Sequence, residues 1–340
     1  MPQQGLESVA RSLVAEGKGI LAADESSPTI EKRFRSIKLP STEENRRSYR
    51  ELLFTTPGFS EFISGVILYD ETIRQKAKDG TSFPQVLSGQ GTIPGIKVDT
   101  GAKSLAGFPG EKVTEGLDGL RERLSAYREM GARFAKWRAV IAIGDGIPTA
   151  FCIMANAQAL ARYAALCQEA DLVPIVEPEV LMDGSHTVDR CEEATTATLS
   201  VVFAKLLEHR VALEGTLLKP NMVLSGKDCP KQAGPSEVAE ATVRCLRRTV
   251  PSAVPGIVFL SGGQSPEQAT LNLSAMNALG RHPWELSFSY GRALQEPVLK
   301  VWKGDPGNVA AAQRAFYHRA RCNGAARFGK YTKEMEATAA

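Results

Sequence analysis

The chain has 340 residues, of which 43% are hydrophobic and 23% are charged, and its formal net charge is +3. A charge this close to balance gives no case for binding nucleic acid or a membrane surface. The length suits one large α/β barrel or two smaller domains, and the composition is typical of a soluble globular protein.

The cysteines and the N-terminal segment both indicate a cytoplasmic protein. The six cysteines are scattered with no C-x-x-C pair, which is typical of free thiols in a reducing compartment. Residues 1–14, MPQQGLESVARSLV, lack the apolar core of a signal peptide, and no run reaches the length of a membrane span.

Eight short apolar segments recur along the chain, and most are bounded by Gly, Pro or Asp. Such segments predict buried strands. They are GILAAD (19–24), GVILYD (65–70), PGIKVD (94–99), FAKWRAVI (134–141), VPIVEPEV (173–180), TLLKPNMV (216–223), GIVFLSGG (256–263) and ELSFSYG (285–291).

The segments between these strands have helical patterns. Leu6 to Val14 predict a first helix that ends at Gly17 and covers one end of the fold. Ser41 with Glu44 predicts a capping box ahead of a helix that reaches Phe54. Leucines at helical spacing predict a helix over 117–130, and Ser265-Pro266 starts another that runs to Gly280.

Strands that alternate with helices favour a (β/α)8 barrel or a doubly wound sheet. The near match to a dinucleotide fingerprint at 144–149 lacks its third glycine, and no Gly-Lys pair precedes Ser or Thr. We therefore predict an α/β protein of the (β/α)8 TIM barrel type. It would be a single domain over 1–329 with an N-terminal helix, followed by a mobile polar tail over 330–340.

Charged side chains interrupt the predicted strands, although parallel strands buried on both faces should be almost purely apolar. One such residue by itself is best explained by a structural ion pair or an exposed strand end. A whole set is better explained by an active site at the C-terminal ends of the strands. The set comprises Asp24, Lys97, Lys136, Arg138, Glu177, Glu179 and Lys219.

Three lysines gathered in one barrel mouth would repel one another, so the best enclosed of them should lose its proton most easily. Lowering a lysine pKa from about 10.4 to about 7 requires about 4–5 kcal/mol. A neutral amine beside a carboxylate can attack a ketone and form an imine. This argument leaves open which lysine is the nucleophile.

The last two strands end in groups that suit an anion. Ser261 and Gly262 follow the seventh strand, and Gly291 and Arg292 end the eighth. Barrels often bind phosphate at this position. A Gly-Gly pair by itself more often marks an ordinary turn. The four histidines, His186, His209, His282 and His318, lie outside strand ends and show no metal-ligand pairing, so we expect no catalytic metal.

Seven segments resemble the class I fructose-1,6-bisphosphate aldolases, in order and over about residues 6–331. They are LAADES (21–26), PGIKVD (94–99), GARFAKWR (131–138), VPIVEPE (173–179), EGTLLKPNMV (214–223), FLSGGQS (259–265) and SFSYGRALQ (287–295). The resemblance implies reversible cleavage of fructose 1,6-bisphosphate to dihydroxyacetone phosphate and glyceraldehyde 3-phosphate. It also implies a homotetramer, and neither a metal nor an organic cofactor.

The resemblance also implies residue roles. Lys219 would form the Schiff base, Glu177 would be the acid/base with help from Glu179, and Asp24 would orient the C4 hydroxyl. Lys136 would keep Lys219 unprotonated and, with Arg138, stabilise negative charge. The C1 phosphate would bind Ser261, Gly262, Gly291 and Arg292, and the second phosphate would bind Lys97, Ser26 and Arg33.

Two features differ from the family pattern. Pro28-Thr29 stands where the family commonly has Gly and Ser, and Pro28 has no N–H to offer a phosphate. The last aromatic residue is Tyr331, whereas animal and plant relatives end in a longer tail with a terminal tyrosine. Two alternatives stay open from the residues: a Schiff-base enzyme for another keto sugar, such as a transaldolase, and a non-catalytic barrel.

Overall fold

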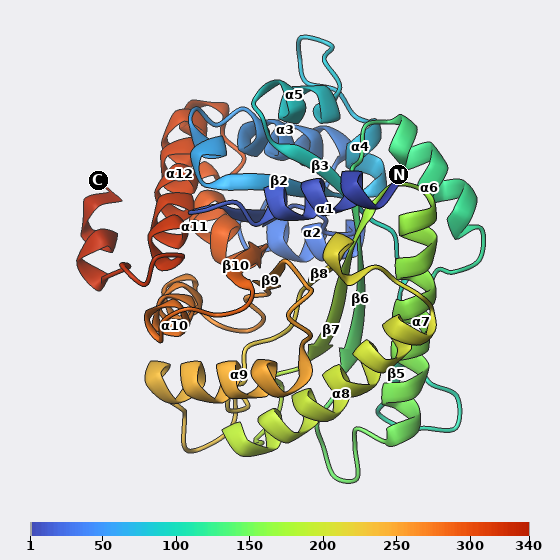
Figure 1. Ribbon diagram of the computed structural model, residues 1–340. Coiled ribbons are helices and arrows are strands. Elements are labelled where there is room, and N and C mark those ends of the chain that lie inside the picture. The colour runs from blue at the N-terminus through green and yellow to red at the C-terminus, as the bar shows by residue number, and fades with distance from the viewer. Residues whose placement is uncertain (1, 340) are drawn as a thin grey trace.

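A computed structural model describes residues 2–339 and shows a closed parallel barrel surrounded by helices (Figure 1). The strand order is β1-β10-β9-β8-β7-β6-β3-β2. The barrel strands are β1 (Gly19–Ala22), β2 (Ile63–Leu68), β3 (Ile93–Lys97), β6 (Phe134–Ile141), β7 (Val173–Val180), β8 (Leu217–Leu218), β9 (Gly256–Phe259) and β10 (Glu285–Tyr290). The predicted (β/α)8 barrel is confirmed.

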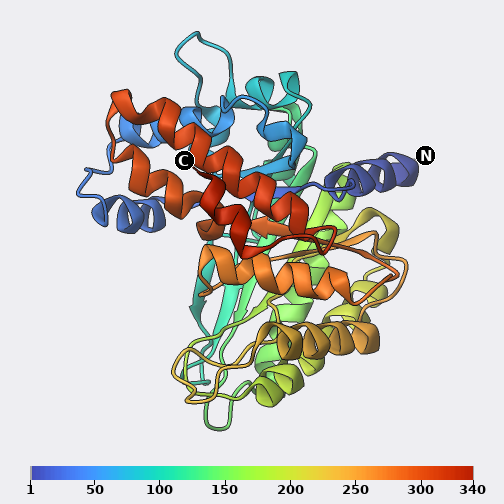
Figure 2. The same ribbon diagram turned by 90° about the vertical axis from the view of Figure 1, so that its left-hand side faces the viewer.

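The helices enclose this barrel, and Figure 2 turns the C-terminal ones towards the viewer. The α-helices are α1 (Pro2–Leu13), α2 (Ser27–Arg35), α3 (Glu43–Phe54), α4 (Asp70–Arg74), α5 (Phe83–Gly89), α6 (Leu120–Glu129), α7 (Ala150–Glu169), α8 (Val188–Glu208), α9 (Pro235–Thr249), α10 (Pro266–Ala278), α11 (Arg292–Trp302) and α12 (Val309–Ala326). The 3-10 segments are η1 (Phe59–Glu61), η2 (Leu213–Gly215), η3 (Pro306–Asn308) and η4 (Lys333–Ala339).

Three details differ from the sequence-based predictions. The sixth predicted strand, 216–223, is a regular strand only over Leu217–Leu218. The Lys219 N–H and the Pro220 carbonyl still bond to the neighbouring segments, but Pro220 has no N–H with which to extend the ladder. Helix α3 is capped by Thr42, which accepts from the Asn45 N–H, and not by Ser41. An antiparallel hairpin, β4 (Gly101–Ser104) with β5 (Lys112–Glu115), lies in the connection after β3 and was not predicted.

Helix α1 closes the N-terminal end of the barrel, as predicted. Leu6, Leu13 and Val14 are buried in one cluster with Phe134 and other residues that line the barrel interior. The strands leave room for them with glycines: a Cβ on Gly256 would lie 2.5 Å from the Val14 side chain. Apolar side chains therefore fill the interior at this end of the barrel.

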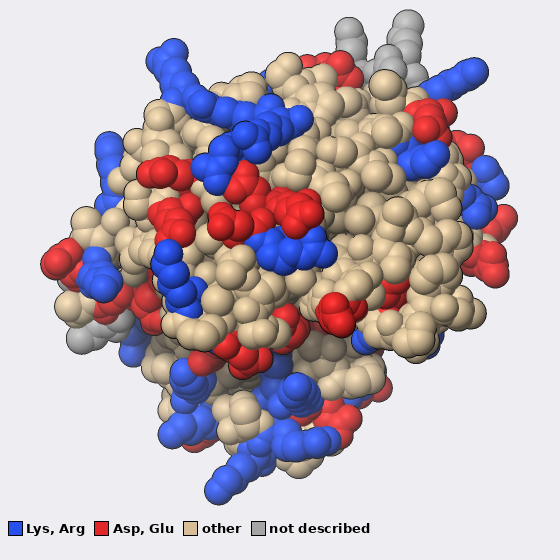
Figure 3. Space-filling model, turned by 90° about the horizontal axis from the view of Figure 1, so that it is seen from below, with Lys and Arg blue, Asp and Glu red and all other residues tan. Residues whose placement is uncertain are grey.

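One helix, α7, passes a length-and-composition test for a membrane span, and 56% of that stretch is buried within the fold. Core helices pass the same test, so this is weak evidence for a span. Figure 3 shows one face of the surface, where Lys and Arg side chains are interspersed with Asp and Glu. No single charge sign dominates that face.

The chain after α12 turns at Gly329 and forms η4. Glu336 of η4 forms an ion pair with Arg319 of α12, its Oε2 lies 3.5 Å from His318 Nε2, and the Tyr331 hydroxyl donates to Glu336 Oε1 over 2.6 Å. The division into a barrel over 1–329 and a mobile tail over 330–340 stays a prediction.

Candidate active site

The charged residues of the predicted set lie at the C-terminal ends of the strands. Side chains on a strand alternate, so every second residue points into the barrel. On β6, Phe134 belongs to the apolar interior cluster, and Lys136 and Arg138 follow it on the same face. On β7, Val173 and Ile175 line the interior, and Glu177 and Glu179 continue that row. On these two strands the barrel interior is therefore apolar towards the N-terminal ends and charged towards the C-terminal ends.

Four of the predicted residues form one buried cluster. Lys136 Nζ lies 2.6 Å from Asp24 Oδ2 and 3.2 Å from Glu177 Oε2. Lys219 Nζ lies 3.2 Å from Glu177 Oε1. Lys136, Glu177 and Lys219 are each 3% exposed. Several buried charges are costly to desolvate and are not expected without a chemical purpose.

Strand register explains how these residues meet. Asp24 comes two residues after β1, whose neighbours in the closed barrel are β2 and β10. The Lys219 N–H donates to the Val176 carbonyl over 2.8 Å, which fixes Lys219 beside Glu177 although β8 has ended. Closure of the sheet brings the four side chains together from four separate strand ends.

The pKa of Lys136 differs from what repulsion between the lysines alone would give. Burial favours the neutral form of Lys136, but Asp24, Glu177 and Asp99 outweigh it and raise the Lys136 pKa above its ordinary value. Lys136 is therefore a charged ammonium. The sequence argument counted the like charges and left out the carboxylates between them.

The same coupling keeps the carboxylates ionised. Burial alone would raise the pKa of Asp24, but Lys136, Lys219 and Lys97 lower it well below its ordinary value. Burial acts on Glu177 in the same direction and is outweighed by Lys136, Lys219 and Arg138, so its pKa is also lowered. Both groups can accept a proton from a bound substrate.

The rim of the cluster holds Arg138 and Glu179 as an ion pair, joined at 2.5 Å. Lys97 lies nearby on β3 and donates to both the backbone oxygen and Oδ1 of Asp99, at 2.8 and 2.6 Å. Asp99 also accepts from the Arg138 backbone N–H over 3.2 Å. Sequence analysis did not select Asp99, although it ends the PGIKVD segment beside Lys97.

The residues predicted to bind the C1 phosphate lie at the ends of neighbouring strands, β9 and β10. Gly262 has φ +54°, a left-handed conformation that favours glycine. The Arg292 guanidinium donates to the Gly262 carbonyl and so links the two strand ends. Ser261 is buried.

The residues expected to bind the second phosphate do not all point to one place. Ser26 precedes α2 as its N-cap, and its hydroxyl lies 3.1 Å from that of Thr29. Pro28 lies in the first turn of α2, where a missing N–H costs little. Arg33 instead points towards β10: its Nη2 lies 3.5 Å from where a Cβ on Gly291 would be.

Glu25 was also missed by the sequence analysis. It is 7% exposed and forms ion pairs with Arg33 and Arg50, the latter at 2.7 Å. The Gln295 side-chain amide donates to it over 2.8 Å. Glu25 thus joins α2, α3 and α11 directly beside Asp24. The signal available in the sequence was an acidic residue directly after the catalytic candidate Asp24 in the LAADES segment.

His186 lies in the loop after β7, and neither of its ring nitrogens has a hydrogen-bond partner among the described residues. Its backbone carbonyl accepts from the Gly226 N–H over 2.8 Å, and Thr187 rather than His186 caps α8. His186 thus lies outside the strand, as expected.

A parallel barrel that gathers lysines and carboxylates at the carboxyl ends of its strands places the protein among the barrel enzymes. The family model for class-I fructose-bisphosphate aldolase matches residues 5–340. The probable fructose-bisphosphate aldolase class 1 of Xanthomonas axonopodis pv. citri is 60% identical over 332 residues, which cover 97% of this chain and 99% of the relative. The fructose-bisphosphate aldolase 1 of Toxoplasma gondii is 57% identical, over 95% of this chain and 89% of that one.

A solved structure agrees with these relatives. The fructose-bisphosphate aldolase of Plasmodium falciparum, in complex with TRAP and a small-molecule inhibitor, has a TM-score of 0.96 and 53% identity, covering 97% of this chain and 96% of that chain. The chain belongs to the class I fructose-bisphosphate aldolase family. It is a metal-independent lyase that reversibly cleaves fructose 1,6-bisphosphate through a lysine Schiff base. This membership decides against the transaldolase and non-catalytic alternatives.

Proposed function

We propose that Lys219 is the Schiff-base nucleophile and that Glu177, Asp24 and Lys136 serve it. The observation that most directly supports this assignment is the distance of 3.2 Å between Lys219 Nζ and Glu177 Oε1 inside the barrel mouth. A lysine amine next to a proton-accepting carboxylate is the equipment that imine formation requires.

The contacts of the three lysines favour Lys219 for this role. Lys136 has two carboxylate partners, one of them at 2.6 Å, and its raised pKa keeps it charged. Lys97 is tied to two oxygens of Asp99. Among the described residues, Lys219 has one ion pair, in which its Nζ lies 3.2 Å from Glu177 Oε1. This distance is longer than the 2.6 Å between Lys136 Nζ and Asp24 Oδ2. It is the lysine least committed to a charged partner.

The chemical steps follow from these positions. The Lys219 amine adds to the C2 carbonyl of the ketose and, as water leaves, becomes an iminium. Glu177 accepts a proton from the nitrogen as the bond forms and passes it to the C2 oxygen, and one further proton from solvent lets that oxygen leave as water. A carboxylate then takes the C4 hydroxyl proton, the C3–C4 bond breaks, and its electron pair passes to the iminium to give an enamine. Glyceraldehyde 3-phosphate leaves first. Protonation at C3 and hydrolysis release dihydroxyacetone phosphate and the Lys219 amine.

Asp24 and Lys136 act on the same substrate atoms. Asp24 orients the C4 hydroxyl and shares its proton with Glu177. Lys136, which bridges the two carboxylates, stabilises negative charge on the sugar oxygens. The Arg138–Glu179 pair assists at the rim.

Two anion sites would hold the ends of the substrate. Ser261, Gly262, Gly291 and Arg292 bind the C1 phosphate at the ends of β9 and β10. Lys97, Ser26 and Arg33 receive the second phosphate, Ser26 at the N-terminus of α2, where backbone N–H groups favour an anion. Holding both ends places C2 beside Lys219.

Assembly and location belong to the same proposal. We infer a cytoplasmic homotetramer, which binds neither nucleic acid nor membrane. The fructose-bisphosphate aldolase 4 of Arabidopsis thaliana, 56% identical, is named as cytosolic. Light scattering on the purified protein tests the oligomer: a mass of four chains supports it, and a monomer or dimer overturns it.

Borohydride trapping with dihydroxyacetone phosphate, followed by peptide mass mapping, tests the nucleophile. We expect one reduced adduct on Lys219, none in Lys219→Arg, and an undiminished adduct in Lys227→Ala. Lys227 is a suitable control because it is an exposed lysine paired with Asp183. An adduct on Lys97 or Lys136, or full cleavage by Lys219→Arg, would overturn the assignment.

A further inference from the structure

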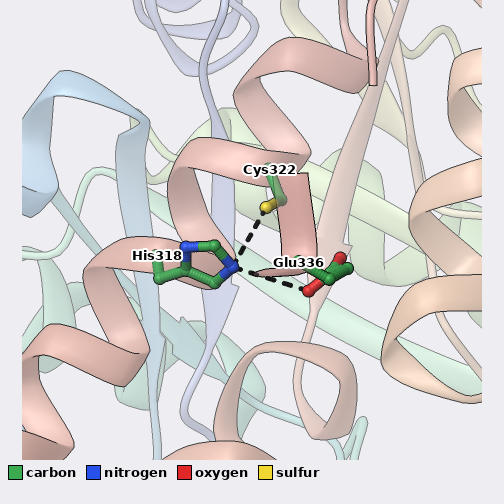
Figure 4. Close-up of side chains that lie close together, drawn as sticks. All are labelled: His318, Cys322 and Glu336. Carbon is green, nitrogen blue, oxygen red and sulfur yellow. Dashed lines mark hydrogen bonds and ion pairs between the residues drawn. The ribbon is translucent and has the colours of Figure 1, made fainter. Parts of the chain in front are cut away.

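A second group of metal-binding side-chain types lies outside the barrel, on α12 and η4. His318 and Cys322 are four residues apart on α12 and therefore share one face of the helix. Glu336 of η4 approaches the same face (Figure 4). Among the described residues, this is the one group of three such side chains whose ligand atoms all lie within 4.8 Å of one another.

The separations within this cluster match those around a zinc ion. His318 Nε2 lies 3.5 Å from Cys322 Sγ, a normal distance for a hydrogen bond to sulfur, and 3.5 Å from Glu336 Oε2. The second distance is longer than a usual N–H···O hydrogen bond of 2.7–3.2 Å. A tetrahedral zinc ion, with bonds of about 2.0 Å to nitrogen and oxygen and 2.3 Å to sulfur, separates its ligand atoms by about 3.3–3.5 Å.

The second oxygen of Glu336 is already held. Arg319 donates to Oε1, and the Tyr331 hydroxyl donates to the same atom over 2.6 Å. This leaves Oε2 directed towards His318. Outer partners that orient a ligating carboxylate in this way are characteristic of metal sites.

We propose that His318, Cys322 and Glu336 form a binding site for a divalent zinc-type ion. Sulfur, imidazole and carboxylate donors together suit Zn²⁺ better than Mg²⁺ or Ca²⁺, which prefer oxygen. The site is separate from the catalytic chemistry, because none of its residues belongs to the barrel interior.

Binding requires the Cys322 thiol to lose its proton. The thiolate is the form of cysteine that binds a metal ion, so forming the metal–sulfur bond releases one proton to solvent. Histidine coordinates through its neutral imidazole.

The site would fasten the C-terminal segment to the outer helix. His318 and Cys322 come from α12, whereas Glu336 comes from η4, so one ion bridges the two elements. Lys330 and Lys333 lie between them and are potential trypsin sites. Occupancy of the site should slow cleavage at both.

The test uses the full chain, stripped with a chelator and titrated with Co²⁺ and then with Zn²⁺. We expect one Co²⁺ per chain with a sulfur-to-cobalt charge-transfer band, its displacement by Zn²⁺, and release of one proton in weak buffer. Cys322→Ser should abolish the band, and Glu336→Gln should weaken binding at least about tenfold. Cys229→Ser should change nothing, because that thiol donates to the Lys231 carbonyl and is not part of the His318–Cys322–Glu336 group.

A second measurement separates the site from a folding defect. Zn²⁺ should slow tryptic cleavage after Lys330 and Lys333 in the unsubstituted chain and in Cys229→Ser, but not in Glu336→Gln, while all three cleave fructose 1,6-bisphosphate equally. Absence of a charge-transfer band, loss of the band in Cys229→Ser, or unchanged affinity in Glu336→Gln would each overturn the proposal.

Discussion

The ammonium of Lys136 lies 2.6 Å from Asp24 Oδ2, although β6 and β1 are separated in the barrel by β3 and β2. Lys136 also reaches Glu177, so a single cation is shared by two buried carboxylates. This arrangement determines how the cluster responds to substitution and to pH.

Removing the shared cation should impair both folding and catalysis. Lys136→Met leaves Asp24 and Glu177 buried with fewer partners, so we expect the free energy of unfolding to fall by about 3–5 kcal/mol. We also expect kcat to fall by about 10²–10³-fold, because stabilisation of negative charge is lost. Denaturant titration and an aldol-cleavage assay measure the two effects. Lys103→Met, at an exposed position on β4, is the control, and equal behaviour of the two variants would contradict the prediction.

The pH dependence of stability has a predictable sign. The pKa values of Asp24 and Glu177 are lowered from 3.8 and 4.5, so their contribution is present above those values and is lost as the pH falls through the folded-state values. The pKa of Lys136 is raised from 10.5, so its contribution is complete below that value and is lost only as the pH rises through the higher folded-state value.

The cluster should therefore stabilise the fold evenly between about pH 6 and pH 9 and progressively less below about pH 4. The measurement is the difference in unfolding free energy between the unsubstituted chain and Lys136→Met across this range. A difference that grows on acidification would mean that the carboxylate pKa values are raised by burial rather than lowered by the lysines.

Glu25 should be important for stability and for phosphate binding. Glu25→Gln removes the charge that pairs with Arg33 and Arg50, and we expect a loss of about 3–5 kcal/mol with a raised KM for fructose 1,6-bisphosphate. Glu31→Gln, which removes an exposed pair with Arg35 on the same helix, should change stability by less than about 0.5 kcal/mol. Thermal unfolding and initial rates compare them, and a silent Glu25→Gln would refute the role.

The interior of the barrel should not tolerate a methyl group at Gly95. A Cβ there would lie 2.3 Å from the Phe134 ring, so Gly95→Ala should destabilise the fold by about 1–3 kcal/mol or more. Gly89→Ala is the matched control on α5, since its Cβ would meet nothing within 4 Å. We expect that variant to be as stable as the parent or slightly more so. Chemical denaturation decides between the two outcomes.

The sequence by itself located the eight barrel strand segments and identified the charged residues within them, although it missed the β4–β5 hairpin. Segments 134–141 and 173–180 coincide with β6 and β7. Their charged residues are two positions apart, which is the spacing of side chains on one face of a strand, so the sequence pattern could be read as a strand. It also showed that Lys136, Glu177 and Lys219 are exceptions to a buried apolar pattern. Ser261 and Arg292 could be located side by side because they follow the last two strands, which are neighbours in the barrel.

Only the tertiary structure decided which charges are partners. Barrel closure sets Asp24 beside Lys136, and no local pattern contains that distance. The partners of Glu25 lie on α2, α3 and α11, and the Cys322–Glu336 proximity requires η4 to fold back on α12. Local sequence encodes the periodicity of each element, whereas the pKa of a buried group depends on charges that only packing brings within a few ångströms.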